Sequence, residues 1–133
     1  MTSLTALRVL FIDDNELVLD TFLTLARFSN PGWEVRAAPD HDTGLGLART
    51  FAPHVICADI GQMPKPGLSF ARNIRRDGQL KNTFLIAITG WADVRSIGQI
   101  ENAGFDVRLT KPVGYKEFTQ HIEAFAMAQS LLR

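Results

Sequence analysis

Apolar residues along this chain alternate between short runs and stripes with helical spacing. Five short runs combine apolar, β-branched and aromatic residues, a composition typical of strands buried within a sheet. They span residues 7–12, 33–38, 54–59, 83–89 and 106–110, and the second is more amphipathic than the others. The pattern therefore predicts five strands with other elements between them.

Helical spacing of apolar residues predicts five helices between and after these runs. They span residues 16–28, 40–52, 68–77, 92–104 and 114 onward. Asn15 precedes the first helix, Asp40 or Asp42 opens the second, and Gly104 is a natural C-terminal stop for the fourth. Glycines at positions 44 and 46 make the second helix a weaker prediction, because glycine has a low helix propensity.

The alternation of strands and helices predicts the class of fold. Strands separated by helices form parallel sheets covered on both faces, which gives an α/β fold with three layers. No linker, repeat or low-complexity segment interrupts the pattern. We therefore expect one domain over residues 1–133.

Polar residues stand at the carboxyl ends of four predicted strands. Asp13 and Asp14 follow the first, Asp59 ends the third, Thr89 ends the fourth, and Lys111 follows the fifth. Parallel strands share a direction, so these side chains should gather at one edge of the sheet, where open α/β sheets bind ligands.

Three clustered carboxylates repel one another unless a cation lies between them. Oxygen ligands select a hard ion such as Mg²⁺. The metal and a nearby lysine would in turn favour a tetrahedral anion such as a phosphoryl group. The sequence therefore predicts a magnesium site that also accepts phosphate.

Composition narrows the classes of partner. The chain has 133 residues, with 14 Lys+Arg against 14 Asp+Glu, and so lacks the basic excess of most nucleic-acid binders. It has no secretory signal pattern and no apolar run long enough to span a bilayer. The single cysteine, Cys57, lies in an apolar run and is predicted to be buried. We expect a soluble, cytoplasmic protein with no direct nucleic-acid or membrane partner.

Together these motifs resemble the receiver domain of two-component response regulators. The resemblance rests on "DD" after the first strand, Asp59 at the third, "TG" after the fourth and "KP" after the fifth, and it covers nearly the whole chain. Each motif alone is weak, but four in this order and spacing are specific. The resemblance implies the flavodoxin-like fold of the chemotaxis-regulator superfamily, with strand order 2-1-3-4-5.

The family resemblance also implies roles for the acidic residues. Asp59 would be the phosphoacceptor, since a carboxylate is a competent nucleophile that forms an acyl phosphate. Asp13, Asp14, Asp59 and the carbonyl group of Gly61 would hold Mg²⁺. The phosphoryl donor would be a sensor histidine kinase or a histidine phosphotransfer protein. The domain would be a signalling module with an unidentified downstream protein target, not an enzyme.

Three further features follow from the same resemblance. Lys111 would pair with a phosphoryl oxygen, and the Lys111–Pro112 peptide bond would be cis. Thr89 would turn its hydroxyl group toward the phosphoryl group and carry the signal to the face formed by the fourth helix and fifth strand. Arg108 stands where many receivers have an aromatic switch residue, and we expect it to bind a partner instead. The bulky Trp91 is expected to lengthen the lifetime of the acyl phosphate.

Other interpretations of these residues remain open at the level of sequence. Asp13 and Asp14 could simply cap a helix beside Asn15. The domain could be a receiver-like interaction module that works without phosphorylation, or a Mg²⁺-dependent aspartyl-phosphate hydrolase. The hydrolase lacks support because its D-x-D pattern is missing after the first strand. The three histidines are interpreted as surface or strand-edge residues, and the arginines of residues 72–76 as a solvated helix face.

Overall fold

The computed structural model describes residues 6–61, 65–90 and 94–131, in which strands and helices alternate without exception. The strands are β1 (Arg8–Ile12), β2 (Glu34–Ala38), β3 (Val55–Ile60), β4 (Phe84–Thr89) and β5 (Val107–Thr110). The helices are α1 (Glu16–Ser29), α2 (His41–Phe51), α3 (Lys65–Arg76), α4 (Val94–Ala103) and α5 (Tyr115–Leu131). Each predicted element is therefore present, with shifts of a few residues at its ends.

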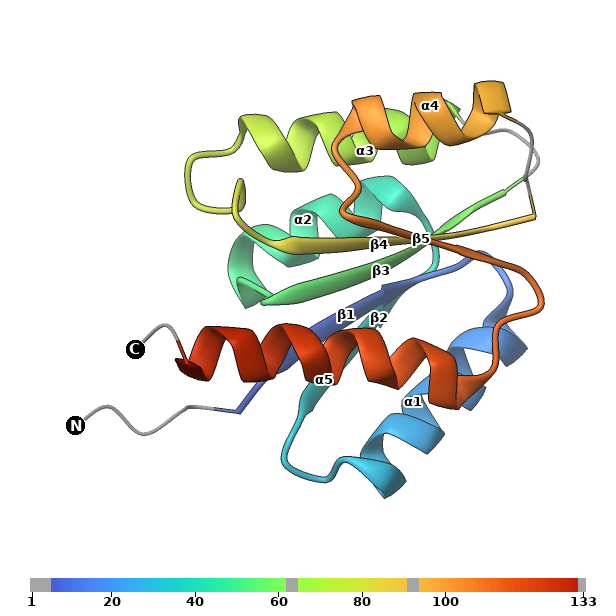
Figure 1. Cartoon of the computed structure of the whole chain (residues 1–133). Helices are drawn as coiled ribbons and strands as arrows, with labels where there is room; N and C mark the ends of the chain where they lie inside the picture. Colours follow the sequence, from blue (N-terminus) through green and yellow to red (C-terminus); the bar gives the residue numbers. More distant parts are fainter. Residues whose placement is uncertain (1–5, 62–64, 91–93, 132–133) are drawn as a thin grey trace.

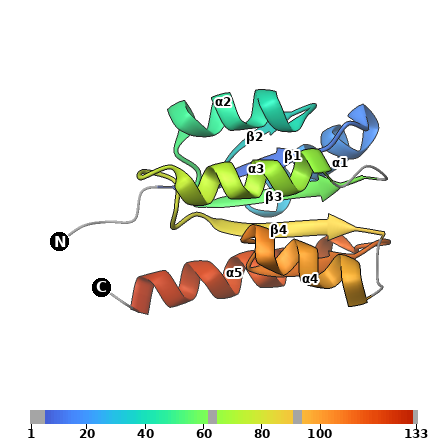
Figure 2. The same ribbon diagram turned by 90° about the horizontal axis from the view of Figure 1, so that it is seen from above.

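All five strands are parallel and lie in the order β2-β1-β3-β4-β5. This is the flavodoxin-like order that the family resemblance implied, and the prediction is confirmed. Helices α1 and α5 cover one face of the sheet, and α2, α3 and α4 cover the other (Figure 1). Seen from above, α3 lies between α2 and α4 (Figure 2). The result is the expected three-layer arrangement.

Alternation along the strands divides the core into two clusters, one for each face of the sheet. In β1, Val9 and Phe11 pack toward α1 and α5, whereas Leu10 and Ile12 pack toward α2 and α3. All four side chains are almost completely buried. The predicted burial of Cys57 is also confirmed, and burial raises the pKa of its thiol.

Two helix N-termini are capped by the side chains of polar residues. Asn15 caps α1 by accepting a hydrogen bond from the N–H group of Val18, and Asp40 caps α2 by accepting one from Thr43. The Thr43 N–H group holds the pKa of Asp40 below its ordinary value. Of the two candidates for the start of α2, Asp40 is therefore the capping residue, while Asp42 lies in the first turn.

Helix α3 begins at Lys65, three residues earlier than predicted. The predicted helix began only at residue 68, because proline and glycine at positions 66 and 67 are typical of turns. Proline is tolerated in the first helical turn, where its missing N–H group would have no partner. Gly67 lets the helix approach β3, since a Cβ atom there would collide with the side chain of Ile60.

Gly44 has a similar role in α2. A Cβ atom at this position would lie 2.5 Å from Cδ1 of Ile12, so a side chain there would force the Ile12 side chain to move. The glycine that weakened the helix prediction therefore allows α2 to pack closely against β1. Gly104 ends α4 with a φ of +116°, as predicted.

The arginines of α3 do not all form a solvated face, and for Arg75 that interpretation was wrong. Its guanidinium group donates hydrogen bonds to the carbonyl groups of Lys81, Thr83 and Gly104. It also forms an ion pair of 2.8 Å with Asp106. Arg75 thus joins α3 to the start of β4 and the end of α4.

None of the helices in the described part of the chain is both long and apolar enough to cross a membrane.

Candidate functional site

The acidic residues meet at the carboxyl edge of the sheet. Strand β1 ends at Ile12, and Asp13 and Asp14 follow it directly. Asp59 was predicted to end its strand, but it is the penultimate residue of β3, because β3 continues to Ile60. Asp59 belongs to the same alternating series as Cys57, so its side chain lies on the face of the sheet covered by α1 and α5.

One carboxylate oxygen from each of Asp13, Asp14 and Asp59 lies within 4.8 Å of the others. Asp59 is buried, Asp13 is partly buried and Asp14 is exposed, so the group opens to solvent on one side. The clustering that the sequence predicted is therefore observed.

Helix capping does not explain these acids. The N-cap of α1 is Asn15, whose side chain accepts the hydrogen bond from Val18. Asp13 contributes only an acceptor for the backbone N–H group of Asn15, at 2.8 Å. Asp14 serves neither purpose in the hydrogen bonds of the described residues. The capping alternative therefore leaves the arrangement of the two carboxylates unexplained.

Lys111 supplies the positive charge of the site. Its Nζ atom lies 2.5 Å from Oδ1 of Asp59. Its backbone N–H group donates to the carbonyl group of Thr89 at 2.8 Å, which ties the start of the β5–α5 loop to the end of β4. The Lys111–Pro112 peptide bond is cis, as predicted. The side chain of Lys111 is 45% exposed, so it has room to move when a ligand binds at Asp59.

The electrostatics of the site favour a bound cation. Burial raises the pKa of Asp13, and the nearby charges of Asp59 and Asp14 raise it further, against opposing effects from the Asn15 N–H group and Lys111. The buried Oδ1 of Asp59 accepts no hydrogen bond within the described residues and has only the ion pair with Lys111. Charged carboxylate oxygens that lie close together and lack a full set of hydrogen bonds are suitable ligands for a hard divalent ion.

Gly61 and Thr89, the two other predicted site residues, lie at different depths near the acids. Gly61 follows β3 and lines a cavity of about 560 Å³ together with Asp13, Asp14 and Asp59. Thr89 is completely buried at the end of β4 and pairs in register with Ile60. It lines neither this cavity nor the larger one beside α1. Thr89 therefore lies at the predicted edge but beneath the surface of the site.

The larger cavity, about 820 Å³, extends from the acids along α1. Its walls include Asp59 and Lys111 at one end and apolar residues of α1 such as Val18 and Phe22 at the other. The acidic site is therefore open to a partner that contacts α1.

Sequence reasoning missed one residue beside Asp59, and its prediction for Arg108 stays a prediction. His41, interpreted as a surface or strand-edge residue, has its Nε2 atom 3.1 Å from the main-chain carbonyl oxygen of Asp59. Arg108 is half-buried and donates to the hydroxyl group of Thr110 at 2.8 Å, so its guanidinium group already has a partner within the chain. Trp91, which was expected to affect acyl-phosphate lifetime, lies outside the described residues.

Comparison with known proteins agrees with this geometry. Residues 9–123 match the family model of the response regulator receiver domain. The polar-differentiation response regulator DivK of Brucella anthropi is 29% identical over 118 residues, which cover 88% of this chain and 94% of DivK. The DivK protein of Brucella ovis matches at the same identity and coverage.

Solved structures with similar folds include a CheY-like receiver domain protein and a chemotaxis protein. A CheY-like receiver domain protein from Methanospirillum hungatei superimposes with a TM-score of 0.84 at 22% identity, covering 96% of this chain and 99% of that one. The chemotaxis protein CheY4 of Vibrio cholerae gives a TM-score of 0.77 at 21% identity, covering 90% and 98%. At this identity the likeness concerns the fold.

Proposed function

The chain belongs to the family of response regulator receiver domains of two-component signalling, and on this premise we propose that Asp59 accepts a phosphoryl group from a phospho-histidine donor. Membership of the family implies a kinase or phosphotransfer partner and a downstream target. It also implies a signalling role, which is not usually classed as enzymatic. The identity of the acceptor residue is our inference from the arrangement around Asp59.

The proposed transfer is a displacement at phosphorus. A carboxylate oxygen of Asp59 forms a new O–P bond while the P–N bond to the donor imidazole breaks. The electron pair of the broken bond stays on the imidazole nitrogen, which takes up a proton as it leaves. Neither an oxidant nor a further co-reactant is needed.

The acids fit Mg²⁺, which Asp13, Asp14 and Asp59 would hold together with the carbonyl group of Gly61. Bound there, the ion would offset negative charge on the transferring oxygens. The open side of the site at Asp14 leaves room for the water molecules that Mg²⁺ retains.

Lys111 is suited to stabilise the phosphorylated state. It now neutralises the carboxylate of Asp59, and once that carboxylate is phosphorylated the anionic phosphoryl oxygens would replace it as the partner of Lys111, within reach of the flexible side chain. The backbone of Lys111 is bonded to Thr89, so a shift of the lysine acts on the end of β4.

We propose that the signal leaves the site through Thr89. This residue pairs in register with Ile60 of β3 and Thr110 of β5. Movement of the Thr89 hydroxyl group toward a phosphoryl group would therefore disturb Thr110 and its bond with Arg108. The output surface would then be the face formed by α4 and β5.

One observation carries the proposal: the carboxylate of Asp59 is buried, its Oδ1 has the ion pair with Lys111 but no hydrogen bond within the described residues, and one of its oxygens lies close to those of Asp13 and Asp14. A structural aspartate at a strand end would not need this surrounding. The same set also disfavours the interaction module that works without phosphorylation, since that function requires none of these charges.

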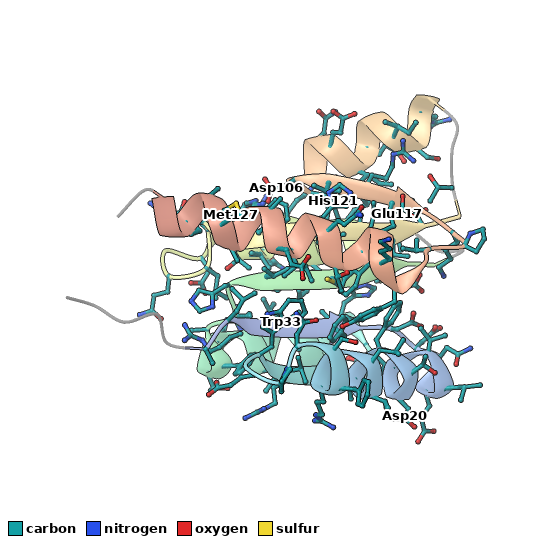
Figure 3. All side chains as sticks on the ribbon, turned by 60° about the horizontal axis from the view of Figure 1, so that its bottom comes forward. Asp20, Trp33, Asp106, Glu117, His121 and Met127 are labelled. Carbon is teal, nitrogen blue, oxygen red and sulfur yellow. The ribbon has the colours of Figure 1, made fainter. Side chains whose placement is uncertain are left out.

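The test is incubation of the protein with acetyl phosphate and Mg²⁺, followed by measurement of the intact mass. We expect a gain of one phosphoryl group that is absent in Asp59→Asn and absent when EDTA replaces Mg²⁺. Asp20→Asn, which changes an exposed aspartate on the outer side of α1 (Figure 3), should be phosphorylated like the parent. A phosphoryl gain retained in Asp59→Asn would contradict the assignment.

A further inference from the structure

His41 is the first residue of α2, and its side chain reaches across to β3. Its Nε2 atom lies 3.1 Å from the main-chain carbonyl oxygen of Asp59. A carbonyl oxygen can only accept, so this hydrogen bond requires the proton of the neutral imidazole ring to be on Nε2. The ring therefore donates to the backbone of the residue that we propose as the phosphoacceptor.

The carbonyl group of Asp59 lies just beyond the point where β1 stops pairing with β3. The last pair between these two strands is Ile12 with Ala58, whereas β4 still pairs with β3 at Asp59. Asp59 itself is buried. A buried carbonyl group without a partner costs about 1–3 kcal/mol, so the position calls for a donor from another element.

The surrounding residues form a fitted slot for the imidazole ring. On α3, the ring of Phe70 lies 5.7 Å from that of His41, centroid to centroid, at an interplanar angle of 49°. Gly67 leaves the necessary space, because a Cβ atom there would lie 3.3 Å from Nε2 of His41. Three elements, α2, α3 and β3, therefore fix the ring in one orientation.

We propose that His41 is a positioning residue for phosphorylation of Asp59. By holding the carbonyl oxygen of Asp59, it fixes the backbone from which the carboxylate projects toward Lys111 and the two neighbouring acids. In this proposal His41 acts through that backbone, although it also lines the cavity that contains the three acids. The inference rests on the proposed function, because it assigns to His41 a part in the same reaction.

Three substitutions separate the hydrogen bond from the bulk of the side chain. His41→Gln can place an amide N–H group near the position of Nε2, whereas His41→Leu keeps an apolar side chain of moderate size without a donor. His121→Leu makes the same change on α5 (Figure 3) and is the matched control. We expect the maximal rate of phosphorylation by acetyl phosphate to fall about three- to tenfold in His41→Leu, corresponding to the loss of one hydrogen bond.

The pattern of rates distinguishes positioning from general destabilisation. The His41→Gln variant should recover most of the parent rate, His121→Leu should keep it, and the Mg²⁺ concentration for half-saturation should not change in any of them. A parent-like rate in His41→Leu, or an equal loss in His41→Gln, would overturn the inference. Failure of the parent to gain phosphate would instead overturn the proposed function.

A spectroscopic measurement tests the hydrogen bond without any phosphorylation. In the unphosphorylated parent, the ¹⁵N shifts of His41 should report a proton on Nε2. The ¹³C resonance of the Asp59 carbonyl group should shift in His41→Leu and shift less in His41→Gln. A proton on Nδ1 alone, or an Asp59 carbonyl resonance unchanged in His41→Leu, would exclude the bond on which the inference depends.

Discussion

At the scale of single residues, repulsion among the carboxylates of the site is opposed by the N–H group of Asn15 and the charge of Lys111. Asp13 shows this balance best. It is partly buried beside two other carboxylates, and its own carboxylate accepts one hydrogen bond, from the backbone N–H group of Asn15. Burial and the charges of Asp59 and Asp14 raise its pKa. The folded state therefore holds the proton of Asp13 more tightly than the unfolded state does, and ionisation of Asp13 opposes folding in the absence of metal.

Replacement of Asp13 by asparagine should therefore stabilise the metal-free protein. Asparagine keeps the oxygen that accepts from Asn15 and removes the charge, so we expect the free energy of unfolding at neutral pH to rise by about 1 kcal/mol, allowing for screening by water. The gain should shrink as the pH falls through the raised pKa of Asp13, where the parent residue also becomes neutral. Urea unfolding in EDTA at several pH values measures this difference.

Asp20→Asn is the control for this substitution, because Asp20 is exposed on α1 and outside the cluster. It should change stability by less than about 0.5 kcal/mol at every pH. A destabilised Asp13→Asn protein at neutral pH would show that the charge of Asp13, with its burial and its repulsion by the other acids, does not oppose folding.

At the scale of elements, Arg75 links parts of the chain that the hydrophobic pattern treats separately. It lies on α3 but binds carbonyl groups in the loop before β4 and after α4, and Asp106 before β5. The carboxylate of Asp106 in turn accepts a hydrogen bond from the N–H group of Leu85, the second residue of β4. One guanidinium group thus fixes the amino-terminal ends of β4 and β5 against α3.

We expect Arg75→Met to lower the free energy of unfolding by about 2–4 kcal/mol. Methionine can fill much of the same volume but removes the hydrogen bonds of Arg75 to three carbonyl groups and to the carboxylate of Asp106, and hydrogen bonds to charged groups are the stronger kind. Urea unfolding followed by circular dichroism measures the loss.

Arg76→Met is the matched control, since Arg76 is the next residue of the same helix and is exposed. Its effect should stay within about 0.5 kcal/mol of the parent. Equal effects of the two substitutions would mean that the network around Arg75 contributes little to stability.

At the scale of the whole molecule, parallel topology gathers distant residues into one site. Residues 13, 59 and 111 come from three separate segments, yet all lie at the carboxyl edge of one sheet because β1, β3 and β5 run in the same direction. A ligand bound among them joins these segments only in the folded state. Binding at this site should therefore be coupled to global stability.

Mg²⁺ should accordingly raise the midpoint of thermal unfolding in a concentration-dependent way. At a concentration about one hundred times its dissociation constant, the ion should add about 2.7 kcal/mol to the free energy of unfolding. Asp14→Asn should reduce this gain, because it removes one of the three carboxylates. Differential scanning calorimetry with and without Mg²⁺ measures it, with NaCl at matched ionic strength as the control. An Mg²⁺ effect no larger than that of NaCl would contradict a specific site.

The sequence by itself determined the alternation of elements and the identity of the clustered polar residues. Short apolar runs and helical stripes are local patterns, and the direction of parallel strands is enough to bring Asp13, Asp14, Asp59 and Lys111 to one edge. The cis Lys111–Pro112 bond was also anticipated, through the family resemblance and not through any local pattern.

Only the tertiary structure decided which polar atoms meet which partners. The contact of His41 with the Asp59 carbonyl group and the carbonyl contacts of Arg75 join residues distant in the chain, and single polar residues leave no periodic trace in a sequence. The early start of α3 and the glycine in α2 are decided in the same way, by how closely each helix must approach its strand. Periodicity records which face of an element is buried, whereas donors, acceptors and close contacts depend on the neighbours that folding supplies.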